Sequence, residues 1–289
     1  QSVVCAFCYI FFGRLNPSAK LPETFPLKLE DNPSYLSYIG EGDTVEYREG
    51  IFVGYRYYDK KKMKVLFPFG HGLSYTTFEY SNLRTDKDFM KDTDTMEVSV
   101  DVKNTGSMAG REVVQLYVSD KESTVIRPVK ELKGFEKVEL APGETKTVTF
   151  RLDKRAFAYY SVKIHDWHVE TGAFDLLVGS SSQDIRVTKE VHVESTVKIP
   201  FVYTTDTIMG DVLKDPRARE IVKELLKLDI FGGEKDKAES SAASEAISAE
   251  MNKAMAGFMP LRGALSFGGD MNMADIQDLV EQLNGLDEG

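Results

Sequence analysis

The sequence is poor in cysteine and histidine, and it contains no long hydrophobic run. Its only cysteines, Cys5 and Cys8, are spaced like half of a zinc ribbon or a redox pair, but no second CxxC and no histidine pair at ligand spacing follow. We therefore expect no metal, and we expect both cysteines to pack inside an apolar run. This run, from Val3 to Gly13, is too short for a membrane span or a secretory signal with its basic start, so it predicts a buried strand or helix.

Two further observations bear on the cellular context. The sequence starts at Gln1 rather than at a methionine, so we expect it to begin inside a larger gene product. The cysteines, which have no evident disulfide pairing, and the lack of a signal segment favour a reducing, cytoplasmic compartment. We expect no membrane partner.

Positive charge is also scarce. The chain carries 36 Lys and Arg against 46 Asp and Glu, a net charge of -10. Nucleic-acid binding depends on clustered cations that neutralise phosphates, so no nucleic-acid partner is expected and an uncharged or cationic ligand fits better. The length of 289 residues allows one large domain or two to three smaller ones.

Most catalytic and cofactor motifs are missing. The sequence has no GxGxxG, P-loop, HExxH or intact GxSxG, so we expect no cofactor. The nearest match is GLSYT at residues 72–76, where a threonine replaces the last glycine of a nucleophile elbow. A serine hydrolase would use Ser74 as nucleophile, His71 as base and Asp59 to orient it, but Ser74 and His71 on one loop suit a triad poorly. A turn hydroxyl is the simpler interpretation of Ser74.

The pattern of apolar residues changes twice along the chain. Residues 13–80 are mostly loop, with a helix end at Gly13 and a strand around residues 21–25. Between residues 93 and 196, segments such as MEVSVDVKN, REVVQLYVSD and KTVTFRL alternate apolar and polar residues. Strands of this kind over about 100 residues predict a β-sandwich of the immunoglobulin or fibronectin type III kind.

The remaining sequence predicts turns, an aromatic patch and a helical tail. Turns are expected at residues 104–106 and 141–144. In KIHDWHVE, His165 and His168 would point to opposite faces of a strand, which favours a cross-strand aromatic patch with Trp167 over a metal site.

From residue 199 onward the spacing becomes helical. Asp215 and Pro216 are typical of an N-cap and first turn, and a final helix is expected at about residues 273–283.

Five motifs occur in a familiar order: FFGRLNPSAKLPETFP, YREGIFVGYRYYD, FPFGHGLSYTTFEYSNL, VDVKNTGSMAGREVVQLYV and PVKELKGFEKVELAPGETKTVTF. Together they resemble the second domain and the fibronectin type III-like domain of family 3 glycoside hydrolases, in particular bacterial β-glucosidases. The resemblance covers about residues 10–196. It implies a mainly β chain with some α: the end of an α/β sandwich domain at residues 1–80, a fibronectin type III-like β-sandwich at 81–197, and a helical tail at 198–289 with a linker at 232–247.

The chain also departs from this family. The family's nucleophile is an Asp in a first, barrel domain, and its acid/base is a Glu earlier in the second domain; neither motif occurs here. A (β/α)₈ barrel needs about 250 residues, more than remain. We therefore expect the C-terminal portion of a retaining β-glucosidase, inactive alone, whose catalytic residues come from a missing barrel domain and segment. Ala19 replaces the common Gly of NPSG, and residues 1–12 differ from the family's Ala-rich helix.

The aromatic segment from Glu49 to Tyr80 lies, by this resemblance, near the domain interface above the sugar pocket. Its implied substrate-binding residues are Arg56, Tyr57, Tyr58 and Asp59, which would contact a β-glucoside or cello-oligosaccharide. Alternatively, Tyr57 and Tyr58 alternate along a strand, so that one packs inward and only one can face the cleft. Phe69, His71 and Tyr75 are expected to brace the junction between the α/β part and the sandwich.

Two other functions stay open. The chain could be a non-catalytic module that binds carbohydrate or supports an interface, or a small serine esterase that uses Ser74. The absence of a first domain would leave apolar surface uncovered, which predicts a homo-oligomer.

Overall fold

The computed structural model describes residues 2–199, 201–226, 257–267 and 272–287. The chain divides into two compact units, Gln1–Lys198 and Ile199–Gly289. The linker predicted at 232–247 lies outside the described residues. Within the described ranges, no helix is both long enough and apolar enough to cross a membrane.

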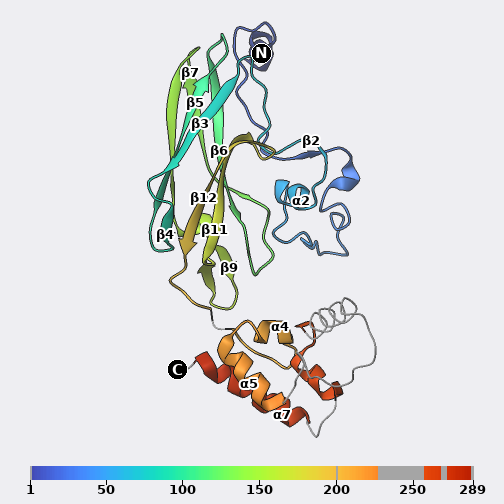
Figure 1. Ribbon diagram of the computed structural model, residues 1–289. Helices are drawn as coiled ribbons and strands as arrows, with labels where there is room; N and C mark the ends of the chain where they lie inside the picture. Colours follow the sequence, from blue (N-terminus) through green and yellow to red (C-terminus); the bar gives the residue numbers. More distant parts are fainter. Residues whose placement is uncertain (1, 200, 227–256, 268–271, 288–289) are drawn as a thin grey trace, which may run out of the picture. The chain divides into compact units, whose positions relative to one another are not determined.

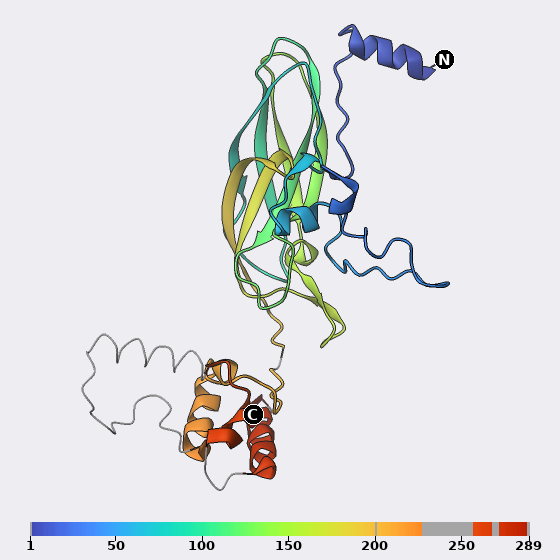
Figure 2. The same cartoon turned by 90° about the vertical axis from the view of Figure 1, so that its right-hand side faces the viewer.

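The first unit is built around two facing β-sheets (Figures 1 and 2). One sheet has the strand order β4-β12-β11-β6-β7 and the other β3-β5-β8. Among the strand pairs in the described residues, only β4 and β12 run parallel. The strands are β3 (Phe78–Thr85), β4 (Phe89–Lys91), β5 (Met96–Asn104), β6 (Gly110–Asp120), β7 (Glu131–Leu140), β8 (Thr145–Leu152), β11 (Gly172–Ser181) and β12 (Asp184–Glu194). The predicted mainly β sandwich is confirmed. Residue 80, at which the α/β part was expected to end, lies within β3.

The core of the sandwich follows from the alternation in the sequence. In β5, Val98, Val100 and Val102 are fully buried, while the residues between them are turned away from the core. Phe174 and Leu176 of β11 face the same core from the opposite sheet. Alternate residues of a strand point to opposite faces, so one apolar row on each sheet suffices to fill the space between the sheets.

The predicted turn at residues 141–144 is confirmed: the Glu144 amide donates to the Ala141 carbonyl oxygen at 3.0 Å. Gly143 adopts a φ of +78°, which glycine takes without strain. By contrast, β7 could not be recognised from alternation, because Leu140 is its only buried residue.

The histidine pair is placed partly as expected. His168 lies on β10 (Asp166–His168), where its ring is 5.7 Å from Tyr159 of β9 (Tyr159–Ser161). Trp167 is likewise 5.7 Å from Tyr160, so the cross-strand aromatic patch is confirmed. His165, however, lies in the turn before β10 with a φ of 51°, not on the strand.

The N-terminal run forms helix α1 (Ser2–Phe11), and the chain turns at Gly13, where φ is +67°. The prediction that this run is buried is wrong for its described side chains. Phe11 and Phe12 are 71% and 75% exposed and Cys8 is exposed, because no described part of the chain covers them. The packing of Cys5 lies outside the described side chains.

The strand predicted around residues 21–25 is shorter than expected. Strand β1 comprises only Phe25–Pro26 and pairs with β2 (Val65–Phe67). It does not extend back to residue 21, because Pro22 has no amide hydrogen to donate to a neighbouring strand.

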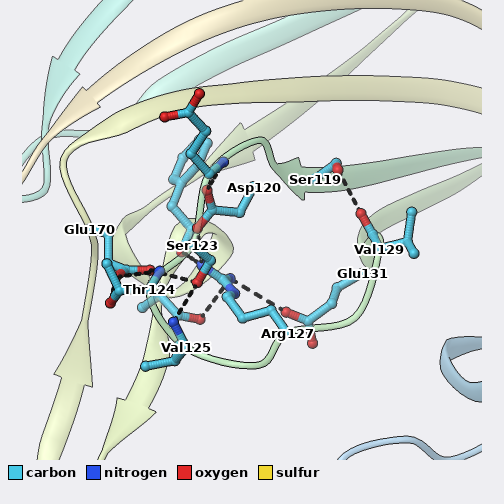
Figure 3. A network of polar contacts seen from close by, with 12 residues as sticks. Ser119, Asp120, Ser123, Thr124, Val125, Arg127, Val129, Glu131 and Glu170 are labelled. Carbon is cyan, nitrogen blue, oxygen red and sulfur yellow. Dashed lines mark hydrogen bonds and ion pairs between the residues drawn. The ribbon is translucent and has the colours of Figure 1, made fainter. Parts of the chain in front are cut away.

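The loop between β6 and β7, residues 121–130, is fixed by a buried arginine (Figure 3). Arg127 donates to Asp120 Oδ2 at 2.8 Å and to the Phe157 carbonyl at 3.0 Å, and only 9% of its side chain is exposed. Phe157 ends the short helix α3 (Lys154–Phe157). Burial outweighs the neighbouring guanidinium and raises the pKa of Asp120 above its ordinary value. Arg127 thereby ties the loop to the end of β6 and to the end of α3.

The other side of this loop is held by a carboxylate from outside it (Figure 3). Glu170 accepts from the Ser123 hydroxyl at 2.6 Å and from the Thr124 amide at 3.1 Å. A ten-residue loop held at several points in this way keeps one conformation, so it can position whatever packs on it.

The second unit is helical and has its own core. It contains α4 (Met209–Val212), α5 (Pro216–Leu226), the 3-10 helices η2 (Leu261–Phe267) and η3 (Gly285–Asp287), and α7 (Met273–Asn284). As predicted, Asp215 caps α5 by accepting from the Arg217 amide at 2.9 Å. The predicted final helix is α7, whose Ile276, Leu279 and Leu283 are fully buried.

Helix α7 begins with a reciprocal cap. Asn272 Oδ1 accepts from the Ala274 amide at 2.7 Å, while the Asn272 amide donates to the Asp275 carboxylate at 2.7 Å. Both hydrogen bonds satisfy backbone amides at the N-terminus of the helix that have no acceptor within the helix itself.

Replacing Arg127 by Met is expected to lower the free energy of unfolding of the first unit by about 3–5 kcal/mol, because Asp120 then stays buried without its counter-ion. Urea unfolding followed by the fluorescence of Trp167, the only tryptophan, measures this loss. The control is Arg111→Met, which removes an ion pair to Glu139 whose side chains are 57% and 62% exposed and is expected to cost under about 1 kcal/mol.

The loss of stability in the Arg127→Met variant is expected to depend on pH. Since the folded chain raises the pKa of Asp120, the folded state binds the proton more tightly than the unfolded state, and stability falls as pH rises through the folded pKa. Loss of the Arg127 guanidinium strengthens this effect, so the deficit should be smaller near pH 4 than near pH 7. A deficit that is equal at both pH values would contradict the role given to Asp120.

Replacing Asn272 by Ala is expected to lower the stability of the second unit by about 1 kcal/mol through loss of the cap. Far-UV circular dichroism follows the helices, whereas Trp167 fluorescence reports only on the first unit and is expected not to change. Gln277→Ala, at an exposed position in the same helix, is the control and is expected to have little effect. A shift of the Trp167 transition would show that the two units do not unfold separately.

Candidate functional site

Helix α2 (Tyr55–Lys60) contains all four predicted substrate-binding residues. The prediction that Tyr57 and Tyr58 alternate along a strand is therefore wrong. Gly54, with a φ of +58°, turns the chain into the helix, and the Lys61 amide closes it on the Tyr57 carbonyl at 3.0 Å. On a helix, residues three apart share a face, so Tyr55 and Tyr58 pack inward together while Tyr57 lies on another face.

Aromatic contacts attach the inner face of α2 to the sandwich. The Tyr55 ring stacks on Phe69 at 4.7 Å and meets Tyr117 of β6 edge-on at 6.0 Å. Its hydroxyl accepts from the Leu132 amide of β7 at 2.8 Å, and burial raises the pKa of Tyr55. Phe69 thus braces the junction as predicted.

Ion pairs hold the same helix from its sides. Arg56 pairs with Glu131 at 2.9 Å, and Asp59 pairs with Lys130 at 2.7 Å. Both partners belong to the end of the braced β6–β7 loop or to the start of β7. Two of the predicted substrate-binding side chains are therefore directed toward the sandwich, and Tyr58 is only 2% exposed.

A pocket of about 430 Å³ lies on the other side of α2. Its lining residues are Pro33, Leu36, Ser37, Arg48, Glu49, Phe52, Tyr57, Lys60 and Lys61. Tyr57 is the only one of the four predicted residues that lines it. Sequence reasoning missed Glu49 and Phe52 as lining residues, although both lie in the EGIFVGYRYYD motif and their place in this motif was the available signal.

The groups considered for a serine hydrolase have other partners. Ser74 Oγ donates to Asn16 Oδ1 at 3.0 Å and accepts from the Thr76 amide at 3.2 Å. The His71 ring stacks on Phe67 at 5.1 Å, and Asp59 is bound to Lys130. The interpretation of Ser74 as a turn hydroxyl agrees with these contacts.

Asn16 is the residue that ties this turn to the sandwich. Its Nδ2 atom donates to the Ala109 carbonyl at 3.1 Å, and its Oδ1 atom also accepts from the Tyr75 amide at 2.9 Å. The Tyr75 hydroxyl donates to the Ile10 carbonyl at 2.9 Å. In the part of the chain that the structure describes, no group of three or more His, Cys, Asp or Glu residues is arranged to hold a metal ion.

Comparison with known proteins adds an independent observation. Residues 112–182 match the model of the fibronectin type III-like domain. The chain is 49% identical over 290 residues to thermostable beta-glucosidase B of Acetivibrio thermocellus, covering 99% of this chain and 37% of that protein. It is 51% identical over 191 residues to a beta-glucosidase of Kluyveromyces marxianus, covering 65% of this chain and 22% of that protein.

Solved structures agree. The crystal structure of a GH3 beta-glucosidase from Bifidobacterium adolescentis matches with a TM-score of 0.66 at 42% identity, over 75% of this chain and 32% of that one. The chain thus spans well under half the length of these relatives and matches their C-terminal part. It belongs to glycoside hydrolase family 3 and corresponds to the C-terminal portion that carries the fibronectin type III-like domain.

Proposed function

We propose that this chain forms one edge of the substrate site of a β-glucosidase, while the catalytic carboxylates lie in a portion outside the chain. The observation that carries the proposal is the position of Tyr57. Helix α2 is fixed to the sandwich by Arg56 and Asp59, yet Tyr57 lines a pocket on its other side. Of the predicted substrate-binding residues we therefore keep Tyr57 as a substrate contact and treat Arg56, Tyr58 and Asp59 as residues that position it.

The distribution of apolar surface supports a further portion that packs here. Large exposed apolar side chains occur in two segments between residues 7 and 53, on or next to helix α1 and in the loop before α2: Phe7, Phe11, Phe12, Leu36, Tyr38, Ile39 and Tyr47. Ile39, for example, is 94% exposed. Extended apolar surface of this kind marks an interface, and a barrel domain from the same protein is the proposed cover.

The chemistry would be retaining hydrolysis of a β-glucoside or cello-oligosaccharide. In such reactions one carboxylate attacks the anomeric carbon and a carboxylic acid protonates the leaving oxygen. This chain would contribute orientation of the sugar and exclusion of water rather than either proton transfer.

A non-catalytic carbohydrate-binding module is the second candidate. The pocket beside α2 favours it, because an aromatic ring and polar groups in one hollow suit a sugar without any catalytic group. The expected homo-oligomer and the cytoplasmic location stay predictions; the first would follow if the apolar surface at residues 7–53 were covered by a second copy.

A chimera tests the leading proposal. If this chain replaces the matching segment of the Acetivibrio thermocellus relative, the chimera is expected to hydrolyse a chromogenic β-glucoside, whereas the chain alone is expected to be inactive. Glucoside turnover by the purified chain alone would contradict the proposal. An inactive but folded chimera would favour the non-catalytic module.

Within the chimera, Tyr57→Ala is expected to raise KM several-fold, since it removes one of the two aromatic side chains, Phe52 and Tyr57, that line the pocket. The control is Tyr160→Ala, which removes an exposed tyrosine of the β9–β10 hairpin and should leave KM unchanged. Equal effects of the two substitutions would remove Tyr57 from the substrate site.

A further inference from the structure

One carboxylate oxygen in the pocket beside α2 has no hydrogen-bond partner in the described part of the chain. The Oε2 atom of Glu49 is buried and makes no hydrogen bond in the described part of the chain, and Glu49 lines the pocket. A buried carboxylate oxygen without a donor is costly, and such atoms are rare in folded proteins. It is therefore expected to receive a hydrogen bond from something that enters the pocket.

The cations around the pocket are already engaged. Arg48 Nε donates to Glu46 Oε2 at 2.8 Å, and Lys61 Nζ donates to the Tyr57 hydroxyl at 3.0 Å. Lys60 Nζ donates to the carbonyl of Arg127 at 3.2 Å. Glu49 is thus free to accept a hydrogen bond, and the lining gives little reason to expect an anionic ligand.

The walls and size of the pocket narrow the ligand class. Phe52 and Tyr57 give apolar, aromatic surface beside the free carboxylate oxygen. A pyranose ring combines these two requirements, since its C–H groups pack on aromatic rings and its hydroxyls donate hydrogen bonds. The volume of about 430 Å³ lies within the range of small-molecule sites and leaves room for one or two such rings.

We propose that this pocket binds a neutral pyranose unit, one hydroxyl of which donates a hydrogen bond to Glu49 Oε2. The unit would belong to the glycoside of the proposed function, so the inference rests on that function for its substrate class. Because the carboxylate accepts a charge-assisted hydrogen bond, it gives orientation as well as affinity.

Binding to the full chain tests the proposal. Saturation-transfer difference NMR titrations with cellobiose and methyl β-glucoside are expected to show binding to the wild-type chain. Glu49→Gln keeps the shape of the side chain but removes its charge, and it is expected to weaken binding about tenfold, the size of a lost hydrogen bond to a charged group. Mannitol, which has hydroxyls but no ring, is expected not to compete.

Glu41→Gln is the matched control, because Glu41 is exposed and does not line the pocket. It is expected to bind like the wild type, and both variants should unfold with the wild-type Trp167 transition. The proposal is overturned if the wild-type chain binds neither sugar, or if Glu49→Gln binds as well as Glu41→Gln. A misfolded Glu49→Gln is replaced by Phe52→Leu, which should weaken binding without touching a charge.

The chimera assay and the binding titrations together distinguish failure of this inference from failure of the proposed function. An active chimera combined with sugar binding that does not depend on Glu49 overturns only this inference. An inactive chimera combined with Glu49-dependent binding overturns the catalytic proposal and leaves the pocket assignment intact.

Discussion

The arrangement of the first unit depends on the ion pairs that the Glu131 carboxylate makes. It pairs with Arg56 of α2 at 2.9 Å, with Lys133 at 3.2 Å and with Arg127 of the braced loop at 3.7 Å, and only 16% of its side chain is exposed. A desolvated charge must keep its partners. Helix α2 has only six residues, too few for a helix that is stable by itself, so its existence depends on this contact with the sandwich.

Local sequence patterns predicted the sandwich well because apolar, buried residues alternate with polar residues along its strands. β5 is the clearest example: Val98, Val100 and Val102 alternate with residues turned away from the core. The cap of α5 and the position of α7 were similarly predictable, since Asp215 precedes a proline and the apolar spacing of α7 is regular. β7 was hidden because it buries one residue, and its place at the edge of the sheet is set by pairing with β6.

The candidate site was harder to predict because its determinants are far apart in the sequence. The segment around Tyr57 is rich in tyrosine, which is typical of strands, yet contacts about seventy residues away make it a helix. For the same reason the motif implied four substrate-binding residues, of which only Tyr57 lines the pocket. The burial expected for α1 failed for a different reason: Phe11 packs on its neighbours Phe7 and Phe12, but Phe11 and Phe12 stay 71% and 75% exposed.

Helix α2 is stable because ion pairs and aromatic contacts hold it against the sandwich. Amide hydrogen exchange across residues 55–63, followed by mass spectrometry in the wild-type chain and in Glu131→Gln, tests it most directly. We expect slow exchange in the wild type, much faster exchange in the variant, and unchanged protection of β5 in both. Exchange of residues 55–63 that is as fast as that of residues 33–53 in the wild type, or that ignores the substitution, would contradict it.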